Sequence, residues 1–165
     1  MKTILICLSR LENPVSNYFW NLGKEFEKRG YRAVLIFDGH YNKYPKISGN
    51  FKFYTWKNLR PVKIWDFLFF MRILQKEKPY ICISNFGSTN IVSILSFLFK
   101  VKNRMNYIHT PLEAILNNYN DNFFAYHIIS KYLKFRKKII YRINTHLLTN
   151  SNGMKDNAII NFNVR

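Results

Sequence analysis

The chain has 165 residues, which is long enough for one domain with a hydrophobic core. Hydrophobic residues make up 48% and aromatic residues 18%, a composition that excludes a disordered chain. The 26 Lys and Arg against 9 Asp and Glu give a formal net charge of +17, which favours an anionic partner such as nucleic acid, an anionic membrane surface or a phosphorylated ligand. An alternative source of this charge is a coding bias towards A/T-rich codons.

Predicted strands and helices alternate along the chain. Short apolar runs predict strands at Lys2–Leu8, Arg32–Phe37, Phe51–Trp56, Tyr80–Ser84, Arg104–His109 and Thr145–Asn150. Helical spacing predicts helices from Pro14 to Gly30, Pro61 to Lys78, Ile91 to Lys100, Leu112 towards Asn122 (where a flexible loop follows), Phe123 to Asn144, and Asn152 to Ile160. This alternation predicts one α/β domain over residues 1–165. We expect a doubly wound, mostly parallel Rossmann-like sheet with helices on both faces and strand order 3-2-1-4-5-6.

Three of the helices have a predicted apolar face. The first face comprises Val15, Tyr18, Phe19, Leu22 and Phe26, and the second comprises Ile64, Phe67, Leu68, Met71 and Leu74. The long helix has Ile128, Ile129, Tyr132, Leu133, Phe135, Ile139, Ile140 and Ile143. Cys7 and Cys82 lie within predicted strands, so we expect buried thiols, with no disulfide and no metal site. The longest apolar stretches are too short to span a bilayer, and no signal peptide is visible, which predicts a cytoplasmic chain.

The carboxyl ends of the strands are the first place to look for a ligand site, because open α/β sheets bind ligands there. The loop at Ser9–Ser16 has no glycine and therefore matches neither the dinucleotide-binding fingerprint nor the phosphate-loop motif. The helix start behind it still offers free N–H groups to an anion, with Asn13, Ser16 and Asn17 as side-chain donors. The alternative is that Asn13 only caps the helix. Asn85 opens the corresponding loop after the fourth strand.

His109 is the candidate catalytic residue. It stands at the carboxyl end of a central strand and precedes Thr110 and Pro111, so its ring is expected to face the ligand, where a neutral imidazole can accept a hydroxyl proton or bind a sugar. The alternative is a histidine that only bonds to a neighbouring carbonyl. Glu113 either orients a substrate or is an acid favoured in the first turn of a helix.

The second half of the long helix is basic. Its cations are Lys131, Lys134, Arg136, Lys137, Lys138 and Arg142. A basic amphipathic helix is typical of a membrane-surface element. The alternative is a solvated helix face packed on the sheet. Nucleic acid is not an expected partner, since no recognition module for it is visible.

The order of elements resembles the N-terminal domain of family-4 glycosyltransferases of the GT-B fold. Four stretches carry the resemblance: Met1–Ile36 with Lys28–Val34 at its end, Lys78–Asn85, Met105–Pro111 with its histidine, and Asn144–Ser151 followed by Gly153–Lys155. Asn163 and Val164 fall where the family's interdomain linker begins. The family's usual Gly-Gly in the first loop is replaced around Asn13 and Pro14, which argues against close approach to a phosphate.

The resemblance implies the acceptor-binding half of a retaining glycosyltransferase. Such an enzyme moves a sugar from a nucleotide-sugar to a lipid-linked or cell-surface polysaccharide acceptor. His109 would position the acceptor and help stabilise the transferred sugar. The family's second, donor-binding domain is absent, so we expect a fragment or half of a split enzyme that needs a second domain or subunit, uses no cofactor of its own, and lies on the inner face of the cell membrane. The alternative is a non-catalytic membrane-anchoring subunit that recruits a catalytic partner.

Overall fold

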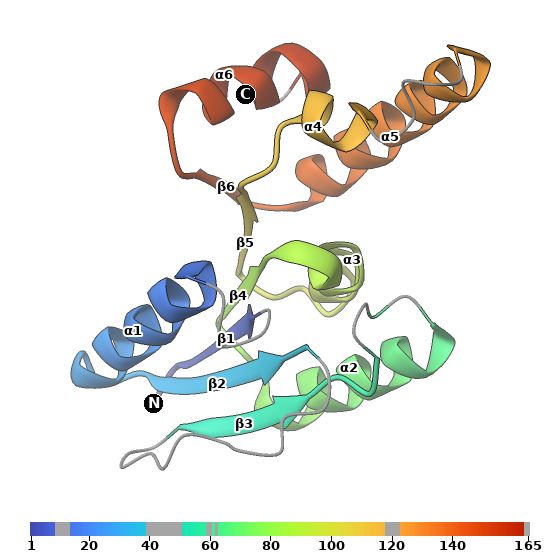
Figure 1. Ribbon diagram of the computed structural model, residues 1–165. Coiled ribbons are helices and arrows are strands. Elements are labelled where there is room, and N and C mark those ends of the chain that lie inside the picture. Colours follow the sequence, from blue (N-terminus) through green and yellow to red (C-terminus); the bar gives the residue numbers. More distant parts are fainter. Residues whose placement is uncertain (9–13, 39–50, 59–60, 62, 118–122, 164–165) are drawn as a thin grey trace.

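The computed structural model describes residues 1–8, 14–38, 51–58, 61, 63–117 and 123–163. Six parallel strands form one sheet in the order β3-β2-β1-β4-β5-β6 (Figure 1). The strands are β1 (Thr3–Leu8), β2 (Arg32–Phe37), β3 (Lys52–Thr55), β4 (Ile81–Ser84), β5 (Asn103–Ile108) and β6 (His146–Thr149). The predicted fold class and strand order are confirmed.

Helices cover both faces of this sheet. They are α1 (Pro14–Lys28), α2 (Ile64–Glu77), α3 (Thr89–Leu98), α4 (Leu112–Leu116), α5 (Phe123–Ile143) and α6 (Asn152–Phe162), with a short 3₁₀ turn, η1 (Phe86–Ser88), before α3. Figure 1 shows α1 on one side of the central strands, α2 and α3 on the other, and α4, α5 and α6 gathered beyond β5 and β6. Right-handed crossovers produce this arrangement, because the chain moves outward from β1 in one direction and from β4 in the other.

The central strands have two buried faces. In β1, Ile4, Ile6 and Leu8 pack beneath α1, whereas Leu5 and Cys7 pack with α2 and α3. Side chains alternate between the faces of a strand, so a strand covered on both sides is a continuous apolar run, as the β1 sequence is. All six residues of β1 are buried.

Most of the predicted apolar faces of α1 and α2 pack against the sheet, with one exposed exception on each helix. On α1, Phe19 is fully buried, and Val15, Leu22 and Phe26 pack against the same core, whereas Tyr18 is 60% exposed. On α2, Leu74 is buried and Phe67 and Met71 pack against the core, whereas Ile64 is 68% exposed. The buried rows also include Ser16 and Gly23 on α1 and Phe70 and Ile73 on α2. Both helices are apolar around much of their circumference, so spacing alone does not select the exact row that the sheet covers.

The predicted apolar face of α5 divides into two in the structure. Leu133 and Ile140 are buried against α4 and α6, with Ile129 and Ile143 partly buried beside them. Ile128, Tyr132, Phe135 and Ile139 are exposed. Only the first set belongs to the core, so the remaining apolar residues of α5 are not explained by packing within the described chain.

Both cysteines are free and buried, as predicted. Burial raises the pKa of the Cys7 thiol well above its usual value and that of Cys82 to about 12. Both thiols are therefore protonated and unreactive at neutral pH. Among the helices of the described residues, none combines the length and hydropathy needed to cross a bilayer.

Candidate functional site

The strand order reverses its direction between β1 and β4, and this point lies in the middle of the sheet. Chain segments leave the carboxyl ends of these two strands towards opposite faces, which is where open α/β sheets bind ligands. The predicted site residues Ser16, Asn85 and His109 follow β1, β4 and β5, three neighbouring strands. The fold therefore brings them to one edge of the sheet.

The first turn of α1 contains a buried hydroxyl that no described residue hydrogen-bonds. Ser16 is fully buried and its Oγ has no partner among the described residues, whereas Asn17 beside it is exposed. Asn13 and the rest of the predicted loop lie outside the described residues. Of the three predicted donors at this helix start, Ser16 alone is both described and buried.

Asn85 is the residue directly after β4, and it is 1% exposed. Neither its Oδ1 nor its Nδ2 has a hydrogen-bond partner in the described chain. Its main-chain oxygen accepts a bond of 2.9 Å from the Ser88 hydroxyl, which fixes the turn into α3. An unpaired buried amide costs about 1–3 kcal/mol of stability, which makes Asn85 a candidate for contact with a bound ligand.

The ring of His109 is half-buried and lies one residue beyond β5. It stacks on Tyr107, with ring centroids 6.0 Å apart and planes at 10°. Tyr107 in turn meets Phe19 of α1 edge-on at 5.0 Å. Desolvation, and then the charge of Lys137, holds the pKa of His109 below its usual 6.5, so the imidazole is neutral at pH 7 and able to accept a hydrogen bond.

These ring contacts place Ser16 and His109 on the α1 side of the sheet. Ser16 is one helical turn before Phe19 and shares its face of α1. His109 is two residues beyond Tyr107 and stacks on it, and Tyr107 packs under α1. A hydroxyl and a neutral imidazole thus share one side of the carboxyl edge, and Asn85 follows the neighbouring strand β4 at the same edge.

Glu113, in the first turn of α4, is held by α6. Its Oε2 accepts 2.7 Å from Asn157 Nδ2, and its Oε1 accepts 3.2 Å from Asn161 Nδ2. A hydrogen bond from its own main chain, followed by these two amides, holds the pKa of Glu113 below 4.5. The carboxylate joins α4 to α6, and its role in acceptor binding stays a prediction, as does that of the half-buried Thr110.

The six predicted membrane-surface cations of α5 differ in exposure. Lys131, Lys134 and Arg142 are exposed, and Arg136 and Lys138 are half-buried. The half-buried Lys137 places its Nζ 5.3 Å from the ring centre of Phe162 in α6. Burial, with the nearby charge of Arg136, lowers the pKa of Lys137 to about 8. Lys137 also acts electrostatically on His109, so it belongs to the surroundings of the candidate site.

One acid at this edge was not among the sequence-predicted site residues. Asp38 follows β2 directly, is 8% exposed, and contributes with burial and Cys82 to the raised pKa of Cys7. The sequence signal that could have identified Asp38 is an acid directly after the apolar run from Ala33 to Phe37. Among the described residues, no three His, Cys, Asp or Glu side chains gather as metal ligands would.

A cavity of about 700 Å³ lies away from these residues, beside the edge strand β6. It is lined by β6, the end of α5 and α6, and includes Arg142, Lys155 and Asn163. Of the predicted site residues, Arg142 alone lines it. The site at the carboxyl edge rests on its polar residues and not on this cavity.

No protein-family model matches the chain, and no curated protein matches it. A similar solved structure is the enzyme WbmG of Bordetella bronchiseptica, in complex with NAD and UDP, which has 14% sequence identity and a TM-score of 0.43. The alignment covers 64% of this chain and 37% of WbmG. Membership of the family-4 glycosyltransferases therefore stays a prediction.

Proposed function

We propose that this chain is the acceptor-binding half of a retaining glycosyltransferase that uses a nucleotide-sugar. The observation that carries the proposal is that a neutral His109 and a buried Asn85, whose amide has no partner among the described residues, follow neighbouring strands at one carboxyl edge. Sugar hydroxyls donate to an imidazole nitrogen, and they both donate to and accept from an amide. The resemblance of Met105–Pro111 to the family's histidine-containing strand supports the same assignment.

The proposed reaction moves one glycosyl group. The bond from the sugar C1 to the nucleoside diphosphate breaks, the acceptor oxygen bonds to C1 on the same face, and the departing diphosphate takes the acceptor proton. His109 and Asn85 hold the acceptor or the transferred sugar by hydrogen bonds. These residues orient the reactants, and correct positioning lowers the entropic part of the activation barrier. Neither acts as a general base, because the departing diphosphate takes the acceptor proton. The nucleotide-sugar would be held by a second domain or subunit.

Sugar binding tests the proposal on the chain itself. We expect oligosaccharide protons to show saturation transfer from the protein in NMR spectra, and we expect His109→Ala to weaken binding of the same sugar by at least about tenfold. His146→Ala is the matched control, since His146 is exposed at the amino end of β6. Equal binding by both variants would remove His109 from the acceptor site.

The turnover number tests the proposed role of His109 in an enzyme in which this chain is joined to a donor-binding domain or subunit. His109→Ala is expected to lower kcat by about a hundredfold or more, whereas His146→Ala leaves it within about twofold. Unchanged turnover in His109→Ala would contradict the proposed role.

The exposed apolar and basic side chains of α5 favour a second candidate function, a non-catalytic subunit that holds a catalytic partner at a membrane. The two functions differ in what His109 does. A recruiting subunit would keep its effect on a partner enzyme after His109→Ala, whereas an acceptor-binding half would lose it.

A further inference from the structure

The outer face of α5 carries a continuous row of exposed apolar side chains, which we call the outer stripe. It consists of Ile128 (53% exposed), Tyr132 (58%), Phe135 (67%) and Ile139 (45%). At about 100° per residue these four side chains lie within about 60° of one another around the helix, and they extend over about 16 Å of its length. The buried Leu133 and Ile140 lie about 120° away, so the stripe is separate from the core.

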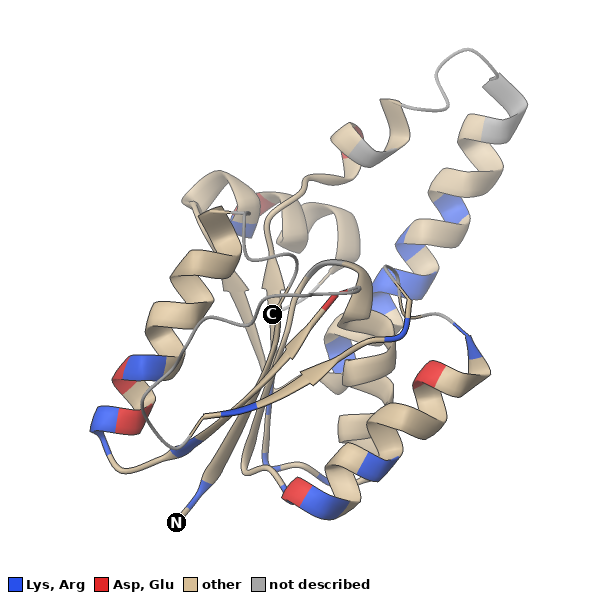
Figure 2. Ribbon diagram, turned by 60° about the horizontal axis from the view of Figure 1, so that its bottom comes forward, with Lys and Arg blue, Asp and Glu red and all other residues tan. Residues whose placement is uncertain are grey.

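A row of cations borders the outer stripe on one side. Lys131, Lys134, Lys138 and Arg142 lie about 40–120° from Ile128, on the side away from the buried residues. Lys131, Lys134 and Arg142 are exposed and Lys138 is half-buried. Figure 2 shows Lys and Arg recurring along α5, part of which projects away from the sheet in both ribbon views. The surface thus has an apolar strip and a cationic strip, side by side.

We propose that the outer stripe docks on an anionic lipid surface, with the stripe among the acyl chains and the cationic row at the headgroups. An interfacial helix has this composition, with aromatic and aliphatic residues on one face and Lys or Arg beside them. Each cation near an anionic surface strengthens binding about fivefold. The first candidate function does not depend on this docking, whereas the second, a subunit that holds a partner at a membrane, requires it.

A second copy of the chain is a poorer occupant for this surface. The spacing of the outer stripe, four, three and four residues, would also suit a pair of helices. The sequence of α5 contains no Asp or Glu, however, so a partner α5 would bring cations against cations and offer no complementary charge. Nucleic acid would neutralise the cations but leave the aromatic and aliphatic stripe in water.

The stripe variants are expected to fold, because the altered side chains are exposed. Arg104 fixes the end of α5 independently of the stripe, since its Nε donates to the Ile143 oxygen at 2.7 Å and its Nη1 to the Val101 oxygen at 2.6 Å. Far-ultraviolet circular dichroism and a melting temperature within a few degrees of the parent would establish that each variant is folded.

Vesicle flotation of the full chain is the direct test. We expect binding to phosphatidylcholine vesicles with about 30 mol% phosphatidylglycerol at about 0.15 M salt, at least about tenfold tighter than to pure phosphatidylcholine. Lys131→Gln with Lys134→Gln is expected to lower the partition coefficient about 25-fold. Lys24→Gln with Lys28→Gln, on the exposed face of α1, is the matched control and should change it less than about twofold.

The apolar part of the stripe is tested separately from its charge. Phe135→Ser with Ile139→Ser is expected to weaken vesicle binding by at least about tenfold. Ile160→Ser is the control, since Ile160 is 79% exposed on α6, outside the stripe. With tryptophan introduced as a fluorescent probe, the emission maximum of Phe135→Trp should shift to shorter wavelength on vesicle binding, whereas that of Ile160→Trp should not.

Three results would overturn the proposal. One is equal vesicle binding by the stripe variant and its control. Another is a dimer in analytical ultracentrifugation that Phe135→Ser with Ile139→Ser dissociates, which would make the stripe an interface between copies. The third is RNA or DNA binding that displaces the vesicles and is insensitive to the stripe substitutions. None of these results depends on glycosyl transfer, so the proposed reaction is tested independently.

Discussion

Three buried polar side chains differ in their partners: Glu77 near the amino ends of the strands is paired, whereas Ser16 and Asn85 at the carboxyl ends are not, among the described residues. Near the amino ends, the buried Glu77 accepts from Lys52 Nζ at 2.6 Å, lies 2.7 Å from Arg32 Nη2, and accepts from the Tyr54 hydroxyl. At the carboxyl ends, Ser16 Oγ and both amide atoms of Asn85 have no partner among the described residues.

This difference separates structural polar groups from those available to a ligand. A buried acid with two cations and a hydroxyl has lost water and gained partners within the fold. A buried amide without partners has lost water and gained nothing, so its partner is expected from outside the chain. Polar character alone, which both ends share, does not distinguish the two cases.

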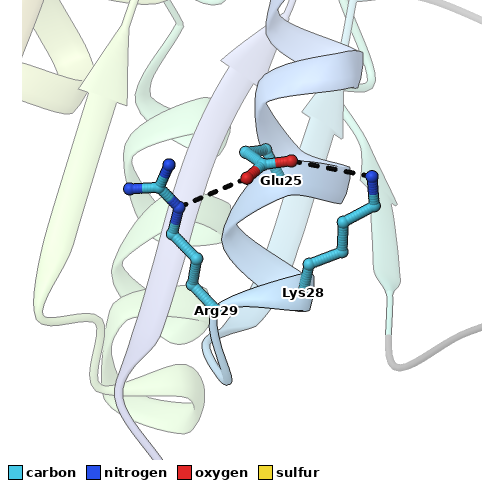
Figure 3. Close-up of polar contacts among 3 residues, drawn as sticks. All are labelled: Glu25, Lys28 and Arg29. Carbon is cyan, nitrogen blue, oxygen red and sulfur yellow. Dashed lines mark hydrogen bonds and ion pairs between the residues drawn. The ribbon is translucent and has the colours of Figure 1, made fainter.

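The largest expected effect is at the paired end. Glu77→Gln should lower the free energy of unfolding by about 2 kcal/mol, because Arg32 and Lys52 lose their counter-charge. Urea denaturation at pH 7 measures this. Glu25→Gln is the control: Glu25 is about half exposed and pairs with Lys28 at 3.6 Å and Arg29 at 3.3 Å on the surface of α1 (Figure 3). It should change stability by less than about 0.5 kcal/mol.

Comparing the parent protein with Glu77→Gln also predicts how the stability contributed by Glu77 changes with pH. Burial alone would raise the pKa of Glu77, but the bonds from Lys52 and Tyr54 and the charge of Arg32 hold it below 4.5. A carboxylate with a depressed pKa stabilises the fold above its unfolded pKa, and this stability is lost as pH falls through the folded value. The stability difference between parent and Glu77→Gln should therefore narrow below pH 4.5. A constant difference would contradict the ion pairing.

A smaller effect, of opposite sign, is expected at the unpaired end. Ser16→Ala should raise the free energy of unfolding by about 1 kcal/mol, because it removes a buried hydroxyl that has no partner among the described residues. Ser93→Ala is the matched change: Ser93 is equally buried in a helix, but its Oγ accepts 2.9 Å from Asn144 Nδ2, so about 1 kcal/mol should be lost. Changes of the same sign in urea denaturation would show that the presence of a hydrogen-bond partner does not decide the contribution of these two hydroxyls.

The smallest expected effect concerns the titration of His109. Lys137→Met should raise the pKa of His109 while leaving it below 6.5, since burial is the larger cause and the charge of Lys137 the second. The Hε1 chemical shift followed by NMR measures this. Lys131→Met, an exposed cation on the same helix, should leave the titration unchanged. If the pKa of His109 is unchanged in Lys137→Met, Lys137 does not act electrostatically on His109.

The sequence predicted the fold well because strand burial is written in local composition. The runs Ile4–Leu8 and Tyr80–Ile83 are continuously apolar, as expected of strands covered on both faces. Gly30 takes the left-handed φ of +79° expected after α1. Predicted element ends lie within a few residues of those observed, except in α4, where residues 118–122 lie outside the described chain. Most residues of the predicted apolar faces of α1 and α2 pack against the sheet, and Tyr18 and Ile64 are the exposed exceptions.

The candidate site was only partly visible in the sequence. His109 and Asn85 could be named because each follows a recognisable strand, and parallel strands end at a common edge. Asp38 was missed as a site residue, because a sequence does not distinguish a solvated loop acid from one that is 8% exposed. Glu113 was foreseen in a first turn, but its two amide partners come from α6, more than forty residues later.

The sequence by itself determined the alternation of elements, the strand order and the neighbourhood of His109, since hydrophobic periodicity and crossover handedness are local rules. Only the tertiary structure decided which polar groups are paired and which half of the apolar surface of α5 is left uncovered. Pairing and burial depend on side chains brought together from distant positions, and helical spacing alone gives Phe135 and Leu133 the same apolar character. Packing against α4 and α6 made one of them core and left the other exposed.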